Sequence, residues 1–440
     1  MNSSRSRSRS AARRRIRAAV LGSVAALSLS MLAACGGDGT PTLNWYVNPD
    51  GVDTLTSLAE QCSTDDYTID IQLLPSGATD QRTQLARRLA AEDSSTDLMS
   101  LDPVFVPEFA NAGWLTPFEG DAATAVTDGI LAGPLDTVMW EDQVFAAPQW
   151  ANTQVVWFRK SLAEAADLKM DDTVTWDQVI EAAADNDGTV GVQANRYEAY
   201  VVWINAMILG AGGDIVSDTE AGKDAQVDID SDAGSKAAAI IEKLADSDAA
   251  QSDLSVSNEG TSLGQMFTDD SAGEFMTNWT FVYKNYHDLV DGGDISQADF
   301  DDLGWARYPR TVADQPSAPP VGGIDIAVGA YTKNPDFALE AAQCVTTSEA
   351  QTALARDEGL MPARGEVYDS PELSEYPDDL LTLWQTSLDE GGARPKSAYY
   401  ALISGAVQSV WHSPTSVDPD STPEESAKFL RDVLDGKALL

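Results

Sequence analysis

The chain has 440 residues, of which 43% are hydrophobic and 22% are charged, a globular composition that argues against global disorder and against a protein with many membrane spans. This length predicts about two or three domains. The chain carries 28 Lys and Arg against 70 Asp and Glu, a formal net charge of -42, so we expect no nucleic-acid partner. Its only two histidines, His287 and His412, leave few candidates for a zinc site or a histidine-based catalytic dyad.

Residues 1–35 have the character of a lipoprotein signal peptide. Seven arginines and no acidic residue lie in this segment, and an apolar stretch runs from Ile16 to Ala34. The sequence Leu32-Ala33-Ala34-Cys35-Gly36 resembles a bacterial lipobox, which implies cleavage before Cys35 and a lipid on its thiol. Cleavage without a lipid is the alternative. We therefore expect a protein held by lipid on the extracytoplasmic face of the cell membrane, since two or more acyl chains anchor durably.

The first elements that follow a short tether at 36–42 alternate between strand and helix. Apolar residues at every second position predict the strands, and apolar residues at helical spacing predict the helices. These elements are strands at 43–47, 69–73 and 96–101, and helices at 53–62 and 80–92. This alternation is typical of an α/β fold with a mainly parallel sheet. Ligands of such sheets bind at the carboxyl ends of the strands, here at 48–50, 75–77 and 102–103.

Three later helices begin with recognisable signals. Thr175 and Gln178 form a capping box, Pro335 takes the first helical position after Asn334, and Thr422 is expected to cap the last helix as Thr175 does. After Cys35, no apolar run is long enough to span a membrane.

The cysteines left after lipidation of Cys35 are Cys62 and Cys344. In an oxidising compartment two cysteines predict one disulfide, and two buried free thiols are the alternative. The bridge would place the end of the first helix beside a helix near residue 340.

Two motifs could carry chemistry. Residues 260–264 match the nucleophile elbow of hydrolases, with Ser262 as the nucleophile, but the polar residues before them do not predict a strand. A helix start after a loop is the other interpretation. Residues 228–234 resemble the start of a calcium loop, but the glycine stands one place late and Ala239 replaces the final Glu. We expect no metal and no cofactor, and we keep a hydrolase that uses Ser262 or paired carboxylates as the alternative to a binding protein.

Aromatic residues recur beside side chains that make several hydrogen bonds. Trp150 precedes Asn152, Trp279 follows Asn278, and Glu198 follows Tyr197. Sugars need this combination, because their C–H faces pack on aromatic rings while their hydroxyls need polar partners. The pattern therefore favours a small-ligand site of the kind that binds carbohydrate.

Several segments resemble the extracellular sugar-binding lipoproteins of ABC importers. They are Leu43–Trp45, Glu108–Phe118, Ala147–Trp150, Trp157–Leu162, Thr175–Asp177, Gly322–Ile324 and Arg394–Pro395. Within this family the chain is most similar to actinobacterial trehalose-binding lipoproteins, through Tyr197-Glu198 and Phe275–Trp279, although Thr280 replaces the family's usual proline.

The resemblance implies a hinged, two-lobed α/β fold of the periplasmic-binding-protein type II class, with a ligand cleft between the lobes. By analogy, the first lobe comprises 41–149 and 307–362, and the second comprises 150–306 and 363–440. The two remaining cysteines would then share the first lobe, so a disulfide would not lock the hinge.

Position and resemblance together imply a binding site drawn from both lobes. Its residues would be Asn48, Asp102, Trp150, Asn152, Glu198, Asn278, Trp279, Gly322, Gly323 and Arg394. Trp279 would stack on a sugar ring, the two glycines would let the backbone approach the ligand, and Arg394 would donate to two oxygens. The resemblance implies a monomer that captures a neutral di- or oligosaccharide, trehalose or a related α-glucoside first, and delivers it unchanged to an ABC permease.

Overall fold

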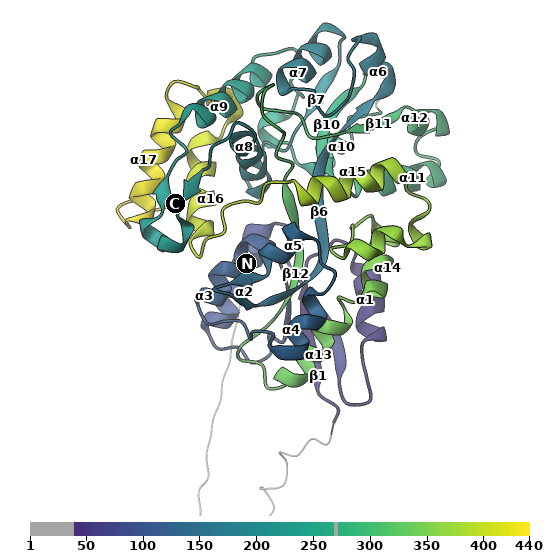
Figure 1. Cartoon of the computed structure of the whole chain (residues 1–440), viewed down its shortest axis with the longest axis vertical. Helices are drawn as coiled ribbons and strands as arrows, with labels where there is room; N and C mark the ends of the chain where they lie inside the picture. Colours follow the sequence, from purple (N-terminus) through teal and green to yellow (C-terminus); the bar gives the residue numbers. More distant parts are fainter. Residues whose placement is uncertain (1–38, 268–271) are drawn as a thin grey trace, which may run out of the picture. The chain divides into compact units, whose positions relative to one another are not determined.

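One long strand, β6 (Ala146–Arg159), joins the two parts of a mixed sheet (Figure 1). The computed structural model describes residues 39–267 and 272–440. The predicted signal peptide and Cys35 lie outside the described residues. Residues 41–440 form one compact unit.

The first part of the sheet contains the three strands predicted near the N-terminus. β1 (Thr42–Val47) lies between β2 (Thr68–Leu73) and β3 (Leu98–Leu101) and runs parallel to both. β12 (Val321–Val328) then pairs antiparallel with β3 and with the first half of β6. We call this part of the chain the first lobe.

The second part of the sheet is built on the other half of β6. β10 (Glu274–Trp279) and β11 (Leu303–Ala306) both pair antiparallel with that half, and β7 (Thr189–Gly191) pairs parallel with β10. We call this part the second lobe. The predicted α/β class and two-lobed architecture are confirmed, but the sheet is mixed rather than mainly parallel, because β12, β10 and β11 run antiparallel to β6.

Helices cover the sheet in both lobes (Figure 1). They are α1 (Val52–Gln61), α2 (Ala78–Ala90), α3 (Val106–Asn111), α4 (Gly120–Thr127), α5 (Ala132–Thr137), α6 (Lys160–Ala165), α7 (Trp176–Asp185), α8 (Glu198–Gly210), α9 (Asp232–Ala245), α10 (Glu259–Leu263), α11 (Val282–Gly292), α12 (Gln297–Asp301), α13 (Pro335–Cys344), α14 (Ser348–Glu358), α15 (Asp378–Asp389), α16 (Tyr400–Trp411) and α17 (Thr422–Leu434). Two short hairpins, β4 (Met139–Trp140) with β5 (Gln143–Val144) and β8 (Val216–Ser217) with β9 (Gln226–Val227), complete the fold. None of the described helices is both long and apolar enough to cross a membrane.

The helix starts follow the sequence signals, with one exception. The predicted capping box is present at the start of α7. The backbone N–H of Gln178 donates to the Thr175 hydroxyl at 3.3 Å, and the side-chain oxygen of Gln178 accepts from the backbone N–H of Thr175 at 3.0 Å. Pro335 begins α13 as predicted. The prediction for the last helix was wrong: Ser421 occupies the cap position of α17, and the Thr422 hydroxyl accepts from Asp418 N–H at 2.9 Å instead of capping.

A disulfide joins Cys62 at the end of α1 to Cys344 at the end of α13, with the two Cα atoms 5.8 Å apart. Both helices pack on the same apolar cluster of the first lobe. This confirms the predicted disulfide and the predicted neighbourhood of the two helices.

The buried helix α8 of the second lobe positions Glu198, one of the residues predicted for the site. α8 is apolar around its whole circumference, and nearly all of its residues are buried. A helix of this kind belongs to a core rather than a surface. Glu198 is its first residue and is 7% exposed.

Candidate functional site

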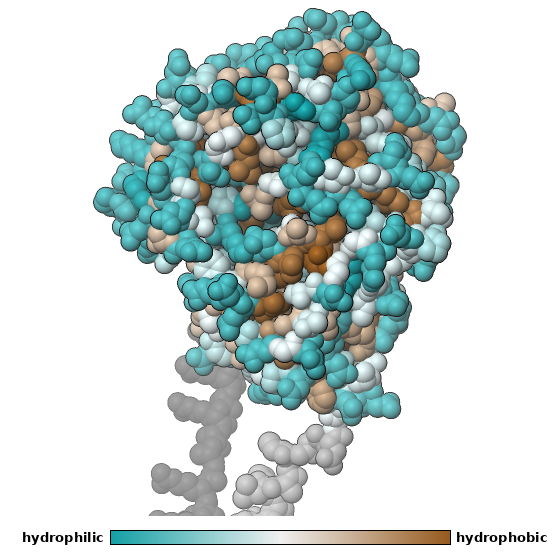
Figure 2. Space-filling model, viewed as in Figure 1, coloured by the Kyte–Doolittle hydropathy of each residue, from teal (hydrophilic) through white to brown (hydrophobic). Residues whose placement is uncertain are grey.

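A cavity of about 760 Å³ lies where residues of the two lobes meet. In the first lobe it is lined by residues that follow strands, among them Asn48 after β1 and Asp102 after β3. In the second lobe it is lined by the starts of α8 and α10 and by the end of β10. Figure 2 shows hydrophobic side chains gathered in an indentation between the upper and lower parts of the molecule. Ligand sites in α/β folds lie beyond the carboxyl ends of the strands, and this rule explains why residues after β1 and β3 line the first-lobe side of the cavity.

Nine of the ten residues proposed for the site line this cavity. They are Asn48, Asp102, Trp150, Asn152, Glu198, Trp279, Gly322, Gly323 and Arg394. Asn278 is the tenth and is fully buried. Its side-chain amide donates to the Glu259 carbonyl at 3.0 Å, and its side-chain oxygen accepts from Trp279 N–H at 2.9 Å. Because neighbouring residues of a strand face opposite sides, Trp279 and Asn278 cannot both face the cavity.

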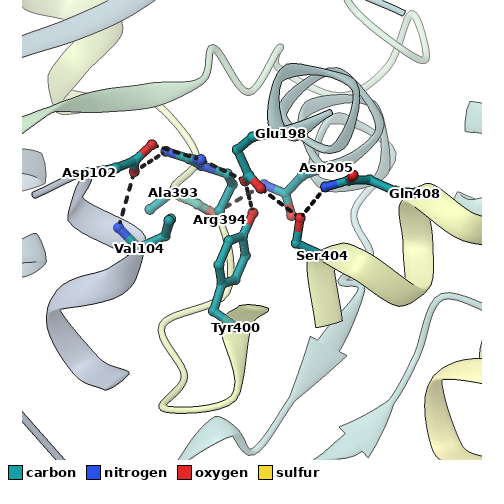
Figure 3. A network of polar contacts seen from close by, with 9 residues as sticks. All are labelled: Asp102, Val104, Glu198, Asn205, Ala393, Arg394, Tyr400, Ser404 and Gln408. Carbon is teal, nitrogen blue, oxygen red and sulfur yellow. Dashed lines mark hydrogen bonds and ion pairs between the residues drawn. The ribbon is translucent and has the colours of Figure 1, made fainter. Parts of the chain in front are cut away.

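Arg394 connects the two walls of the cavity (Figure 3). Its guanidinium donates to Asp102 Oδ1 of the first lobe at 2.8 Å and to Glu198 Oε1 of the second lobe at 2.7 Å. Arg394 is 6% exposed, so both ion pairs are largely shielded from water. The sequence predicted that Arg394 would use two donors on the ligand. In the structure its guanidinium donates to two protein carboxylates, and donation to a ligand stays a prediction.

The pKa values in this cluster follow from burial and from the neighbouring charges. Burial raises the pKa of Glu198, while the Arg394 charge opposes the rise. Burial by itself would lower the pKa of Arg394, but Asp102, Tyr400 and Glu198 together hold it above the ordinary value. Removing the guanidinium from between these two carboxylates would leave buried negative charge without a partner, which is costly.

A second acidic pair, which the sequence analysis did not select, lies on opposite walls of the cavity. Glu259, at the start of α10, accepts from the Tyr197 hydroxyl at 2.7 Å, and Asp50 accepts from the Asn48 side-chain amide at 2.8 Å. Burial raises the pKa of each carboxyl, and the charge of Asp50 further raises that of Glu259. Asp50 belongs to the strand end at 48–50, so the strand-end rule could have identified it. No comparable signal marked Glu259.

The two glycines of β12 also make room for other parts of the protein, and the close approach of their backbone to a ligand stays a prediction. A Cβ on Gly322 would lie 3.3 Å from the Trp279 ring, so this glycine makes room for the indole. Gly323 has φ of 140° and a Cβ there would lie 2.2 Å from the Trp150 carbonyl oxygen, so only glycine fits the pairing of β12 with β6. Trp150 itself is 2% exposed and packs in the first-lobe core, which leaves little of its ring facing the cavity.

Ser262 does not have the environment of a nucleophile. It is fully buried in α10, where its hydroxyl donates to the Val192 carbonyl at 3.0 Å. In the described ranges neither histidine bonds to it, since the His412 ring contacts the Ser255 carbonyl and His287 lies beside Asp288 and Asp291. Asn258 caps the short helix, which confirms a helix start after a loop.

A group that could hold a metal ion lies on the surface of α11. His287, Asp288 and Asp291 bring their ligand atoms within 4.8 Å of one another. Both carboxylates are exposed, and Asp288 already forms an ion pair with Lys284. Residues 228–234, which resemble the start of a calcium loop, follow the β8–β9 hairpin and lead into α9, where Ser231 is the cap.

Comparison with known proteins gives one family and one fold. The family model described as "Bacterial extracellular solute-binding protein" matches residues 48–352. A mannitol-binding protein of Pseudomonas aeruginosa is 28% identical over 103 residues, which cover 23% of this chain and 24% of that protein. The chain therefore matches only about a quarter of the length of this curated relative.

Solved structures with little sequence identity share the whole fold. A maltose-bound MalE3 of T. maritima superimposes with a TM-score of 0.76 at 20% identity, over 90% of this chain and 100% of that one. The GacH receptor of Streptomyces glaucescens, solved unliganded and with acarbose, gives a TM-score of 0.73 at 21% identity, over 91% and 100%. A solute-binding protein of Agrobacterium vitis with D-mannitol gives 0.70 at 16% identity, over 90% and 98%.

Proposed function

Because the chain belongs to the bacterial extracellular solute-binding protein family, we propose that it captures a neutral di- or oligosaccharide between its two lobes. The ligand would be released unchanged to the permease of an ABC importer. We also propose that the protein acts as a monomer anchored through a lipid on Cys35, on the extracytoplasmic face of the membrane. The lobes are proposed to comprise 41–149 with 307–362, and 150–306 with 363–440.

The observation that carries this proposal is the composition of the cavity wall. Both lobes present hydrogen-bonding side chains to one space, and the Trp279 indole lies beside Gly322 at its edge. Hydroxyls need such partners, and an aromatic ring provides a surface for the C–H face of a sugar. The volume also lies within the range of small-ligand sites.

The charge of the cavity favours a neutral ligand over an anion. Among the described residues that line it, seven are acidic and two are basic. The acidic residues are Asp50, Asp102, Glu198, Glu259, Asp288, Asp357 and Glu358, and the basic ones are Lys284 and Arg394. An anionic sugar would be repelled by this excess of carboxylates. We favour trehalose or a related α-glucoside as the ligand, and the next candidates are maltose and polyols such as mannitol.

A thermal-shift panel with isothermal titration tests the proposal. The panel contains trehalose, maltose, maltotriose and mannitol, with glucuronate and glucose 6-phosphate as anionic controls. A neutral sugar present at 100 times its Kd should stabilise the protein by about 2.7 kcal/mol. Trp279→Ala should weaken binding of that sugar about tenfold or more, because the stacking surface is lost. A panel in which no neutral sugar stabilises the protein, or in which the anions bind best, would overturn the proposal.

A further inference from the structure

Three polar side chains on one face of α16 extend the Arg394 cluster into the second lobe (Figure 3). Tyr400, Ser404 and Gln408 are four residues apart, so they lie along the same side of the helix. The Tyr400 hydroxyl donates to Glu198 Oε1, and the Ser404 hydroxyl donates to Glu198 Oε2 at 2.6 Å. The Gln408 side-chain amide donates to the Ser404 hydroxyl at 2.9 Å. Both oxygens of Glu198 therefore have a donor from α16.

Tyr400 also contacts the opposite lobe. Its ring centre lies 6.2 Å from that of Phe105, which belongs to the short helical turn that begins after Asp102. The Arg394 guanidinium carbon lies 5.9 Å from the centre of the same tyrosine ring. One fully buried side chain thus packs against the first lobe, bonds to the second-lobe carboxylate, and lies beside the cation that connects them.

Tyr400 and Ser404 are absent from the described residues that line the cavity, so we expect their hydroxyls to act on a ligand through the lining residue that both of them bond, Glu198. We propose that these two hydroxyls are positioning residues for the sugar site: they fix the Glu198 carboxylate against Arg394, and Arg394 in turn fixes Asp102 on the other wall. This inference rests on the proposed function. When Glu198 is fixed, the two wall carboxylates and the guanidinium are already oriented before a ligand binds. This reduces the entropy cost of ordering these side chains on binding.

The groups that face Glu198 give the network a pH signature. They are Arg394, Asp102 at the end of β3, and the hydroxyls of Tyr400 and Ser404. Burial raises the pKa of Glu198, and the two hydroxyl donors lower it. Removing a donor should therefore let Glu198 take up a proton at a higher pH. A hydroxyl bonded to a carboxylate also contributes more than one bonded to a neutral acceptor.

The first experiment needs no ligand. Urea unfolding of the purified protein is compared between pH 4 and pH 8 for Tyr400→Phe and for the matched control Tyr200→Phe, whose hydroxyl donates at 3.0 Å to the uncharged Trp411 carbonyl. The shift in urea midpoint caused by Tyr400→Phe should be larger at pH 8 than at pH 4, because the lost hydrogen bond to Glu198 is stronger when that carboxyl is ionised. The shift caused by Tyr200→Phe should be the same at both values. Equal shifts at both pH values for Tyr400→Phe would overturn the inference, whatever the protein binds. Ser404→Ala tests the other oxygen if Tyr400→Phe does not fold.

The second experiment titrates the sugar found in the panel over the same pH range. Tyr400→Phe and Ser404→Ala should each weaken binding about tenfold at pH 7, since each removes a hydrogen bond to a charged group. The pH at which affinity falls on acidification should also be higher than in the unaltered protein. An unchanged affinity and pH profile would refute the positioning role. If no sugar binds the unaltered protein, the proposed function fails, and the ligand-free comparison still decides whether the two hydroxyls control Glu198.

Discussion

One buried carboxyl of this protein has no hydrogen-bond partner among the described residues. Glu274, at the start of β10, is fully buried, and both of its carboxyl oxygens lack a hydrogen-bond partner within the described structure. Burial, with a further contribution from Asp253, raises its pKa well above the usual value. A carboxyl in this position is kept protonated by the fold, because an isolated charge in an apolar interior is costly.

This residue should make stability fall as the pH rises. The unfolded chain releases the proton above about pH 4.3, while the folded chain keeps it to a higher pH, so each pH unit between the two pKa values costs about 1.4 kcal/mol. Glu274→Gln cannot ionise and should be more stable than the unaltered protein at pH 8, with the advantage shrinking toward pH 4. Urea unfolding at both pH values checks this, with the exposed Glu242→Gln as control. An advantage that is the same at pH 4 and pH 8 would contradict the interpretation.

Individual helices are fixed by signals of a few residues. The capping box at the start of α7 satisfies two backbone N–H groups, those of Thr175 and Gln178. Thr175→Ala should lower the free energy of unfolding by about 1 kcal/mol, measured by urea denaturation. Thr382 provides the matched control, because its hydroxyl bonds the Asp378 carbonyl inside α15 and caps nothing. Equal losses from Thr175→Ala and Thr382→Ala would show that the cap has no specific effect.

The whole molecule has two lobes that are joined by β6 and by the ion pairs of Arg394. The Cys62–Cys344 disulfide joins two helices of the first lobe only, so it constrains that lobe and adds no covalent link between the lobes. Replacing both cysteines with serine should destabilise the protein by about 2–4 kcal/mol, because the unfolded chain gains freedom. The affinity for the captured sugar should stay within about twofold of the original, since no cavity contact is lost. Unfolding and titration of the same variant check both expectations, and a large loss of affinity would show that the disulfide affects the ligand site.

Much of the fold could be predicted from local patterns. The alternation of strands and helices over residues 42–101, the capping box at Thr175 and the start of α13 each depend on a few neighbouring residues, and each was predicted correctly. The antiparallel strands were missed, because the direction of a strand depends on the path of the chain between elements. The cap at Thr422 was wrong because its hydroxyl has a competing partner in the preceding turn.

The sequence by itself determined which residue types were available to the site and where strands end, and these positions together with the family resemblance selected Asn48 and Asp102, which line the cavity. Only the tertiary structure decided how they are used. Arg394 lies between Asp102 and Glu198, which are far apart in the chain, and the alternation of β10 turns Trp279 toward the cavity and Asn278 into the core. The physical reason is that local spacing sets which face a residue occupies. Its partner on that face comes from a distant part of the chain, as Asp102 and Glu198 do for Arg394, and only the packing of the whole chain brings that part there.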